Sequence, residues 1–178
     1  MNPPLPLCFP AALVSGGQTG ADRAALDFAI ARGLTHGGYC PRGRKAEDGP
    51  IPARYNLQET EFDDYPTRTR MNVEMADATV IFQAGAKLRP RSGCALTASH
   101  ARKTGRPYLI AGEFPDVAAG APALRTFLEL HHPKILNVAG SRESSVPGIS
   151  AYVHAVLTAV AERLPAAAAL RAPYPAPS

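Results

Sequence analysis

The sequence contains no tryptophan and only three cysteines among its 178 residues. Cys8, Cys40 and Cys94 are odd in number and far apart, which disfavours a disulfide framework and leaves no Cys-x-x-Cys pair for a structural zinc ion. No uninterrupted apolar run approaches the roughly 20 residues that span a bilayer, and the N-terminus lacks the pattern of a secretory signal. We therefore expect a cytoplasmic protein with no membrane association and no metal site.

Lysine is also scarce: the chain has four lysines and 15 arginines, and its 19 basic and 15 acidic residues leave a net charge of +4. The planar guanidinium of arginine is suited to phosphate and carboxylate groups. Most other basic residues are scattered, and the two short clusters lie in loops, Arg42, Arg44 and Lys45 in one and Lys87, Arg89 and Arg91 in the other. Nucleic-acid binding usually needs a dense basic stripe, so the sequence favours a small anionic ligand instead.

The organisation of the chain predicts one domain over residues 11–164. Residues 1–10 contain four prolines and residues 165–178 are rich in Ala and Pro, so both ends are predicted to be flexible tails. Between them, short apolar runs at 11–14, 34–36, 78–82, 107–111 and 135–139 alternate with helical patterns at 21–32, 67–76, 95–104, 117–130 and 149–164. The helix at 117–130 is expected to be interrupted by Gly120 and Pro122, and residues 37–66 to form a long irregular stretch. This alternation predicts a doubly wound α/β fold, with a parallel sheet of about five strands and helices on both faces.

Ligands of such sheets bind outside the carboxyl ends of the strands, which points to three loops. The first loop holds three glycines between a strand and a helix, together with Gln18 and Thr19. Its position predicts a phosphate cradle, because glycine allows close approach and a helix start offers free N–H groups. The alternative is that the glycines only shape the turn. On the cradle hypothesis, Gly17→Asp would abolish anion binding and leave the fold intact.

The second loop precedes the helix predicted at 95–104 and includes Ser92, Gly93, Cys94 and Thr97. Its hydroxyls and backbone N–H groups could hold another part of the same ligand, or Ser92 could simply cap the helix. Cys94 near a helix start is either a reactive thiol with a lowered pKa or, by the simpler reading, a small buried side chain.

The third loop follows the last strand. Arg142 could bind a carboxylate or phosphate and Glu143 could pair with Arg142 or with a donor on the ligand, or the two could form a surface ion pair. No serine, histidine and acid order typical of nucleophilic catalysis is legible.

Several ordered motifs resemble the molybdenum carrier family over roughly residues 11–160. They are residues 16–27 (GGQTGADRAALD), 36–49 (HGGYCPRGRKAEDG), 68–73 (RTRMNV) and 136–140 (LNVAG), followed by Arg142 and Glu143. The resemblance implies a Rossmann-like domain related to the lysine-decarboxylase-like phosphoribohydrolases, assembled as a dimer or tetramer. It also implies the molybdenum cofactor (molybdopterin), a pterin with a phosphate and a dithiolene-bound molybdenum, as the ligand.

Carried over onto matching positions, the family motifs place residues 16–20 and 93–97 at the anionic part of the ligand and add basic residues as supplementary cations. Together with the loops above, the predicted binding residues are Gly16, Gly17, Gln18, Thr19, Gly20, Asp22, Arg42, Lys45, Arg68, Arg70, Asn72, Ser92, Gly93, Cys94, Thr97, Arg142 and Glu143.

The enzymatic relatives carry a Pro-Gly-Gly-x-Gly-Thr-x-x-Glu motif whose Glu works in catalysis, whereas residues 91–100 (RSGCALTASH) contain no Glu. The departure favours a binding protein over an enzyme. The first hypothesis is therefore a carrier of molybdenum cofactor, with molybdoenzymes as recipients. The alternatives are a hydrolase of a nucleotide-like metabolite that activates water with Glu47, Asp48 or Glu143, and a sensor of such a metabolite.

Overall fold

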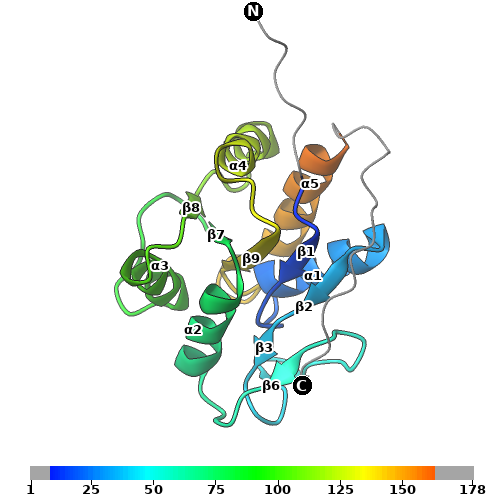
Figure 1. Ribbon diagram of the computed structural model, residues 1–178, viewed down its shortest axis with the longest axis vertical. Helices are drawn as coiled ribbons and strands as arrows, with labels where there is room; N and C mark the ends of the chain where they lie inside the picture. Colours follow the sequence, from blue (N-terminus) through cyan, green and yellow to red (C-terminus); the bar gives the residue numbers. More distant parts are fainter. Residues whose placement is uncertain (1–8, 163–178) are drawn as a thin grey trace, which may run out of the picture.

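The computed structural model describes residues 9–162, which are organised around a five-stranded sheet (Figure 1). The strands lie in the order β2 (Thr35–Gly37), β1 (Ala12–Val14), β9 (Ile135–Gly140), β7 (Ala78–Phe82) and β8 (Tyr108–Ala111). Every pair of neighbours is parallel. The doubly wound α/β prediction is confirmed, including the number of strands.

Helices cover both faces of the sheet. Figure 1 shows α1 (Ala21–Arg32), α4 (Val117–His131) and α5 (Ile149–Ala161) on one face, and α2 (Tyr65–Met75) and α3 (Gly93–Lys103) on the other. Side chains of β7 alternate between them: Val80 and Phe82 join the larger core with α1, α4 and α5, while Ile81 packs against Cys94 and Ala98 of α3. Burial on both faces explains why the strands read as continuous apolar runs.

The strand order contains a switch point between β7 and β9. Counted from β7, the order of the five strands is 2-1-3-4-5, a common doubly wound arrangement. After β7 the chain turns to α3 on one face, and after β9 it turns to α5 on the opposite face. The two loops diverge, which leaves a crevice at the carboxyl ends of β7 and β9.

The predicted irregular stretch has structure of its own. Within it β3 (Tyr39–Cys40) pairs with β6 (Gln58–Glu59), and β4 (Lys45–Ala46) pairs with β5 (Gly49–Pro50). A small core joins this segment to α1 through Leu26, Cys40, Ile51, Tyr55 and Leu57. The guanidinium of Arg44 donates to four backbone carbonyls of residues 51–57 at 2.8 to 3.2 Å. Because such short strands give little periodic signal, the pattern could not predict them.

Helix α4 runs without the predicted interruption. Leu124, Phe127 and Leu128 bury one side of it. Gly120 permits a close approach to α5, since a Cβ there would overlap the hydroxyl of Tyr152. Burial against the core therefore outweighs the cost that Pro122 brings to a helix interior.

Two helices begin two residues earlier than predicted because of their caps. The Asp64 carboxylate accepts from Thr67 N–H at 2.6 Å, and Ser92 Oγ accepts from Ala95 N–H at 3.1 Å. The predicted tails lie outside the described residues except for 9 and 10, as does the predicted end of the last helix at 164. Among residues 9–162, every helix is too short or too polar to traverse a bilayer.

Candidate ligand-binding site

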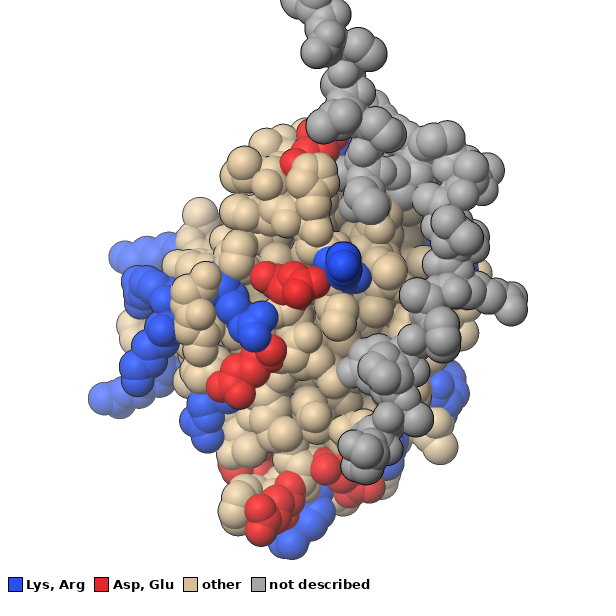
Figure 2. Space-filling view, viewed as in Figure 1, with Lys and Arg blue, Asp and Glu red and all other residues tan. Residues whose placement is uncertain are grey.

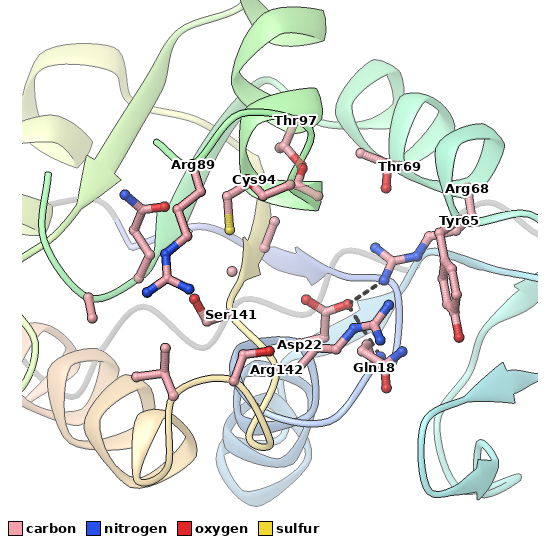
Figure 3. A pocket seen from close by; sticks show the side chains of 18 of the residues that line it. Gln18, Asp22, Tyr65, Arg68, Thr69, Arg89, Cys94, Thr97, Ser141 and Arg142 are labelled. Carbon is pink, nitrogen blue, oxygen red and sulfur yellow. Dashed lines mark hydrogen bonds and ion pairs between the residues drawn. The ribbon is translucent and has the colours of Figure 1, made fainter. Parts of the chain in front are cut away.

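A cavity of about 220 Å³ opens at the carboxyl ends of β7 and β9, at the switch point of the sheet (Figure 3). Its walls come from the loops after β1, β7 and β9 and from the N-terminal parts of α1, α2 and α3. Eight of the predicted residues line it: Gln18, Asp22, Arg68, Ser92, Gly93, Cys94, Thr97 and Arg142. The fold thus brings together side chains up to 124 positions apart in the sequence, from Gln18 to Arg142.

A buried ion pair forms one wall of the cavity. Arg68 Nη2 lies 3.0 Å from Asp22 Oδ2, with side-chain exposures of 11% and 4%. Burial raises the pKa of Asp22, against the opposing effects of Arg68 and of the N–H groups of Gln18 and Gly16. The Nε atom of Arg68 is buried and has no hydrogen-bond partner within residues 9–162. Asp22 therefore fixes the guanidinium while one of its donors stays available.

The amide of Gln18 lies beside this pair and has a fixed orientation. Its Oε1 accepts from the N–H groups of Thr19 and Glu47, each at 3.0 Å. Two backbone donors on one side identify the oxygen. The Nε2 atom faces the other way, is buried, and has no partner in the described part of the chain. A buried donor without a partner costs about 1–3 kcal/mol, which a ligand acceptor would recover.

Other cations complete the wall. The Arg142 guanidinium carbon lies 5.0 Å from the ring centre of Tyr65, and that of Arg68 lies 6.0 Å from the same ring. Lys87 and Arg89 line the cavity from the exposed loop before α3. Among the lining residues Asp22 is the single acid, and it pairs with Arg68. Arg142 Nη1 lies 3.8 Å from Oε2 of Glu47, which lies outside the lining, so Arg142 is partly compensated by Glu47 and not by Glu143. Lys87 and Arg89 add further positive charge. The cavity therefore carries an excess of positive charge.

The start of α3 forms the far wall. Ser92 caps the helix, as the alternative reading expected, and also lines the cavity. A Cβ at Gly93 would meet no atom within 4 Å, so this glycine faces open space. The Thr97 hydroxyl donates to Gly93 O at 2.9 Å. Burial raises the pKa of the Cys94 thiol to about 11. This agrees with the prediction of a small buried side chain and not with a reactive thiolate.

The glycines of the first loop, in contrast, are packed against protein. A Cβ at Gly16 would overlap the Arg68 guanidinium, and one at Gly20 would overlap the backbone of residues 141–143. At Gly17, with φ +75°, it would lie 2.5 Å from Leu57 Cδ1. These glycines admit other parts of the protein, and the loop reaches the cavity through the side chain of Gln18.

Six other predicted residues also lie away from the cavity. Arg42 is exposed, and Lys45 Nζ forms an ion pair with Asp63 Oδ2 at 3.4 Å. Arg70 Nη2 donates to the hydroxyl oxygen of Thr67 at 3.2 Å. The side-chain amide of Asn72 pairs with the backbone of Tyr39: its Oδ1 accepts from Tyr39 N–H at 2.8 Å, and its Nδ2 donates to Tyr39 O at 2.9 Å. This amide therefore hydrogen-bonds β3 as a neighbouring strand would. Thr19 faces a separate shallow hollow beside α1 and α5. Glu143 lines the same hollow.

The hydrolase alternative needs Glu47, Asp48 or Glu143 to activate water, but each of these carboxylates forms hydrogen bonds or ion pairs that connect loops of the protein. Glu47 accepts from the hydroxyls of Thr19 and Ser144, and Asp48 pairs with Arg23 at 2.5 Å. Glu143 accepts from Ser150 N–H and Oγ and from Gly148 N–H at the start of α5. Hydrogen bonds lower the pKa of Asp48 and Glu143, and at Glu47 they outweigh the desolvation that acts to raise it. None of the three lines the cavity.

Sequence reasoning left several lining residues out of the predicted site. Lys87 and Arg89 were recognised as basic, and their place directly after a predicted strand was the signal that could have assigned them to the site. Ser141 carried the same signal, because it follows the strand predicted at 135–139, whereas Tyr65 carried none, because only the fold brings it to the cavity. Within residues 9–162, no group of three His, Cys, Asp or Glu side chains has a geometry that could hold a metal ion.

A family model described as the circularly permutated YpsA SLOG family matches residues 13–161. The chain belongs to this family. The strand order is consistent with such a permutation, since the common order 2-1-3-4-5 appears only when the count begins at β7. A search of curated proteins gives no match.

A solved structure from Syntrophus aciditrophicus SB, named "Putative molybdenum carrier protein", is similar to this chain. The sequences are 38% identical, the TM-score is 0.79, and the match covers 87% of this chain and 96% of the other. The resemblance to molybdenum carrier proteins is therefore confirmed at the level of family.

Proposed function

We propose that this member of the circularly permutated YpsA SLOG family binds a small phosphate-bearing anion in the cavity between β7 and β9, and that its cargo is molybdenum cofactor. The observation that carries the proposal is the excess of cationic side chains over a single, already paired carboxylate. A bound anion would supply the missing negative charge in a partly desolvated site, where charge-assisted hydrogen bonds are strongest. The name of the similar structure from Syntrophus aciditrophicus supports the choice of cargo.

The residues of the cavity suit the phosphate end of such a cargo. Arg68, Arg142 and the fixed amide of Gln18 present donors, and no unpaired carboxylate opposes an anion. The glycine at the start of α3 leaves room beside the free N–H groups of a helix start. The cofactor would bring its own molybdenum and dithiolene, and the chain would hold and shield it. No bond-breaking step is proposed.

The partners implied by this function remain predictions. Molybdoenzymes are the expected recipients, and a dimer or tetramer is the assembly expected from the family resemblance.

The proposal is tested on protein purified from a host that makes molybdenum cofactor. Mass spectrometry of the released small molecule and elemental analysis of the same sample should give pterin and molybdenum in nearly equal amounts. Arg142→Gln should lose most of both, because its guanidinium lines the cavity. The matched control is Arg70→Gln, which removes an exposed arginine outside the cavity and should retain the cargo.

Two results would contradict the proposal. A nucleotide without molybdenum in the wild-type protein would exclude the carrier assignment and would call for a hydrolysis screen. Equal loss of cargo in both variants would mean that the retained molecule depends on overall charge and not on the cavity.

A further inference from the structure

The cations of the cavity fall into two groups rather than one. Figure 3 shows Arg68 and Arg142 near Gln18 on one side of the cavity and Arg89 on the other, with Cys94 and Ser141 between them. The groups come from different elements: α2 and the loop after β9 supply the first, and the loop between β7 and α3 supplies the second.

We propose that the cavity contains two anion subsites and therefore selects a ligand with two negatively charged groups separated by an uncharged segment. The inner subsite consists of Gln18, Arg68 and Arg142. The outer subsite consists of Lys87, Arg89 and the N-terminal turn of α3. This inference rests on the proposed function and specifies the chemistry of its ligand.

The inner subsite is built and rigid. Gln18 is 4% exposed and Arg68 is fixed by Asp22, and both keep a buried donor without a partner in residues 9–162. The amide of Gln18 cannot turn its oxygen inward, because two N–H groups hold that oxygen. Both donors belong to residues that line the cavity, and an N–H group without a partner favours an acceptor such as a phosphate oxygen over a cation.

The outer subsite is open. Lys87 and Arg89 are exposed, and Gly93 faces empty space. At the start of α3 the Ser92 hydroxyl accepts from the amide of Ala95 and caps no other amide of that turn. Figure 2 shows Lys and Arg side chains gathered on the side of the molecule where α3 lies. An anion held here exchanges with solvent, so its binding should depend more on salt than binding at the inner subsite.

The region between the subsites does not suit a charge. Cys94, which lies between them in Figure 3, is 8% exposed, and burial raises the pKa of its thiol to about 11, so this side chain is uncharged at neutral pH. Uncompensated charge in such surroundings is costly. A single anion midway between the subsites would lie too far from either group of cations to pair well with it. Two anions at a suitable spacing can each pair with one group.

The test is titration calorimetry with methylphosphonate and with alkylene bisphosphonates of one, three and five methylene groups. In the wild-type protein a spaced bisphosphonate should bind about tenfold or more tightly than methylphosphonate, since the second anion binds at high effective concentration. Arg89→Gln should remove that gain and weaken methylphosphonate, which the inner subsite holds more tightly, by much less than Arg142→Gln does. Arg142→Gln should weaken both probes. Arg91→Gln, which changes an exposed arginine of the same loop that does not line the cavity, should alter neither.

The outcomes separate this inference from the proposed function. Methylphosphonate binding without a gain for any bisphosphonate overturns the two subsites and leaves the proposed function standing. Equal weakening of both probes by Arg89→Gln also overturns them, because it indicates one shared site. Binding of neither probe by a folded wild-type protein overturns both proposals.

Discussion

Two glycine-containing segments lie at the carboxyl edge of the sheet, one at residues 15–20 before α1 and one at residues 91–94, which form the start of α3. In the first, a side chain at any glycine would strike Arg68, Leu57 or the backbone after β9. In the second, a side chain at Gly93 would strike nothing. Glycine therefore serves close packing of protein against protein in the first segment and leaves space for a ligand in the second. A glycine-rich loop before a helix is a position for an anion only when its concave side remains empty.

The largest expected effect contrasts one substitution at both segments. Gly17→Asp should destabilise the fold by about 3 kcal/mol or more, because it combines a positive φ, a clash with Leu57 and a charge buried beside Ile51. This replaces the expectation, drawn from the cradle hypothesis, that the fold would survive. Urea unfolding followed by circular dichroism gives the measurement.

The control is Gly93→Asp. It should stay as stable as the wild type, since an acid at a helix start is tolerated, while the gain in affinity for a spaced bisphosphonate falls. A stable Gly17→Asp protein that has lost only its anion binding would restore the cradle at the first segment.

A pH effect of intermediate size tests the second segment. Folding raises the pKa of Cys94 from 9.0 to about 11, so the folded protein retains a proton that the unfolded chain releases. The stability that this thiol contributes is complete below pH 9 and is lost as the pH rises toward 11. The full loss is about 2.8 kcal/mol, at about 1.4 kcal/mol for each of the two pKa units, and about 2 kcal/mol of it is reached by pH 11.

Urea unfolding at pH 8 and pH 11 measures this effect. Cys94→Ala should show a smaller decline than the wild type, whereas equal declines would mean that Cys94 is not desolvated. Burial also raises the pKa values of Cys40 and Tyr152, and both side chains remain in each protein, so the difference isolates Cys94.

The smallest effect concerns the cap of α3. Ser92→Ala should cost about 1 kcal/mol, because Ala95 N–H loses its acceptor. Ser92→Asn keeps an acceptor and should remain close to the wild type in thermal unfolding. If both variants bind methylphosphonate as the wild type does, Ser92 acts on the helix alone. Loss of binding in the alanine variant beyond its loss of stability would contradict that purely structural role.

The fold was largely predictable from the sequence, and the site in part. Leu13, Val80 and Leu136 lie in apolar runs that hydrophobic pattern identifies directly, and the runs alternate with amphipathic helices. The segment containing Arg44 was not predictable, since its strands have two residues each and its stability comes from carbonyls brought together by folding. Arg68 and Asn72 belong to one motif and lie four positions apart on the same face of α2, yet only Arg68 reaches the cavity, because Asn72 lies one turn further along the helix and binds the backbone of Tyr39.

The sequence by itself determined the class of fold, and it predicted a site at the strand ends and an anionic ligand, because these follow from local patterns and from the types of residue present. The tertiary structure alone decided which glycines are open, which cations share the cavity and which donors lack partners. Those properties depend on distances between residues such as Gln18, Arg68 and Arg142, which are far apart in the chain. Local preferences do not encode them, since they arise only when the strand order brings the loops after β1 and β9 to one end of the sheet.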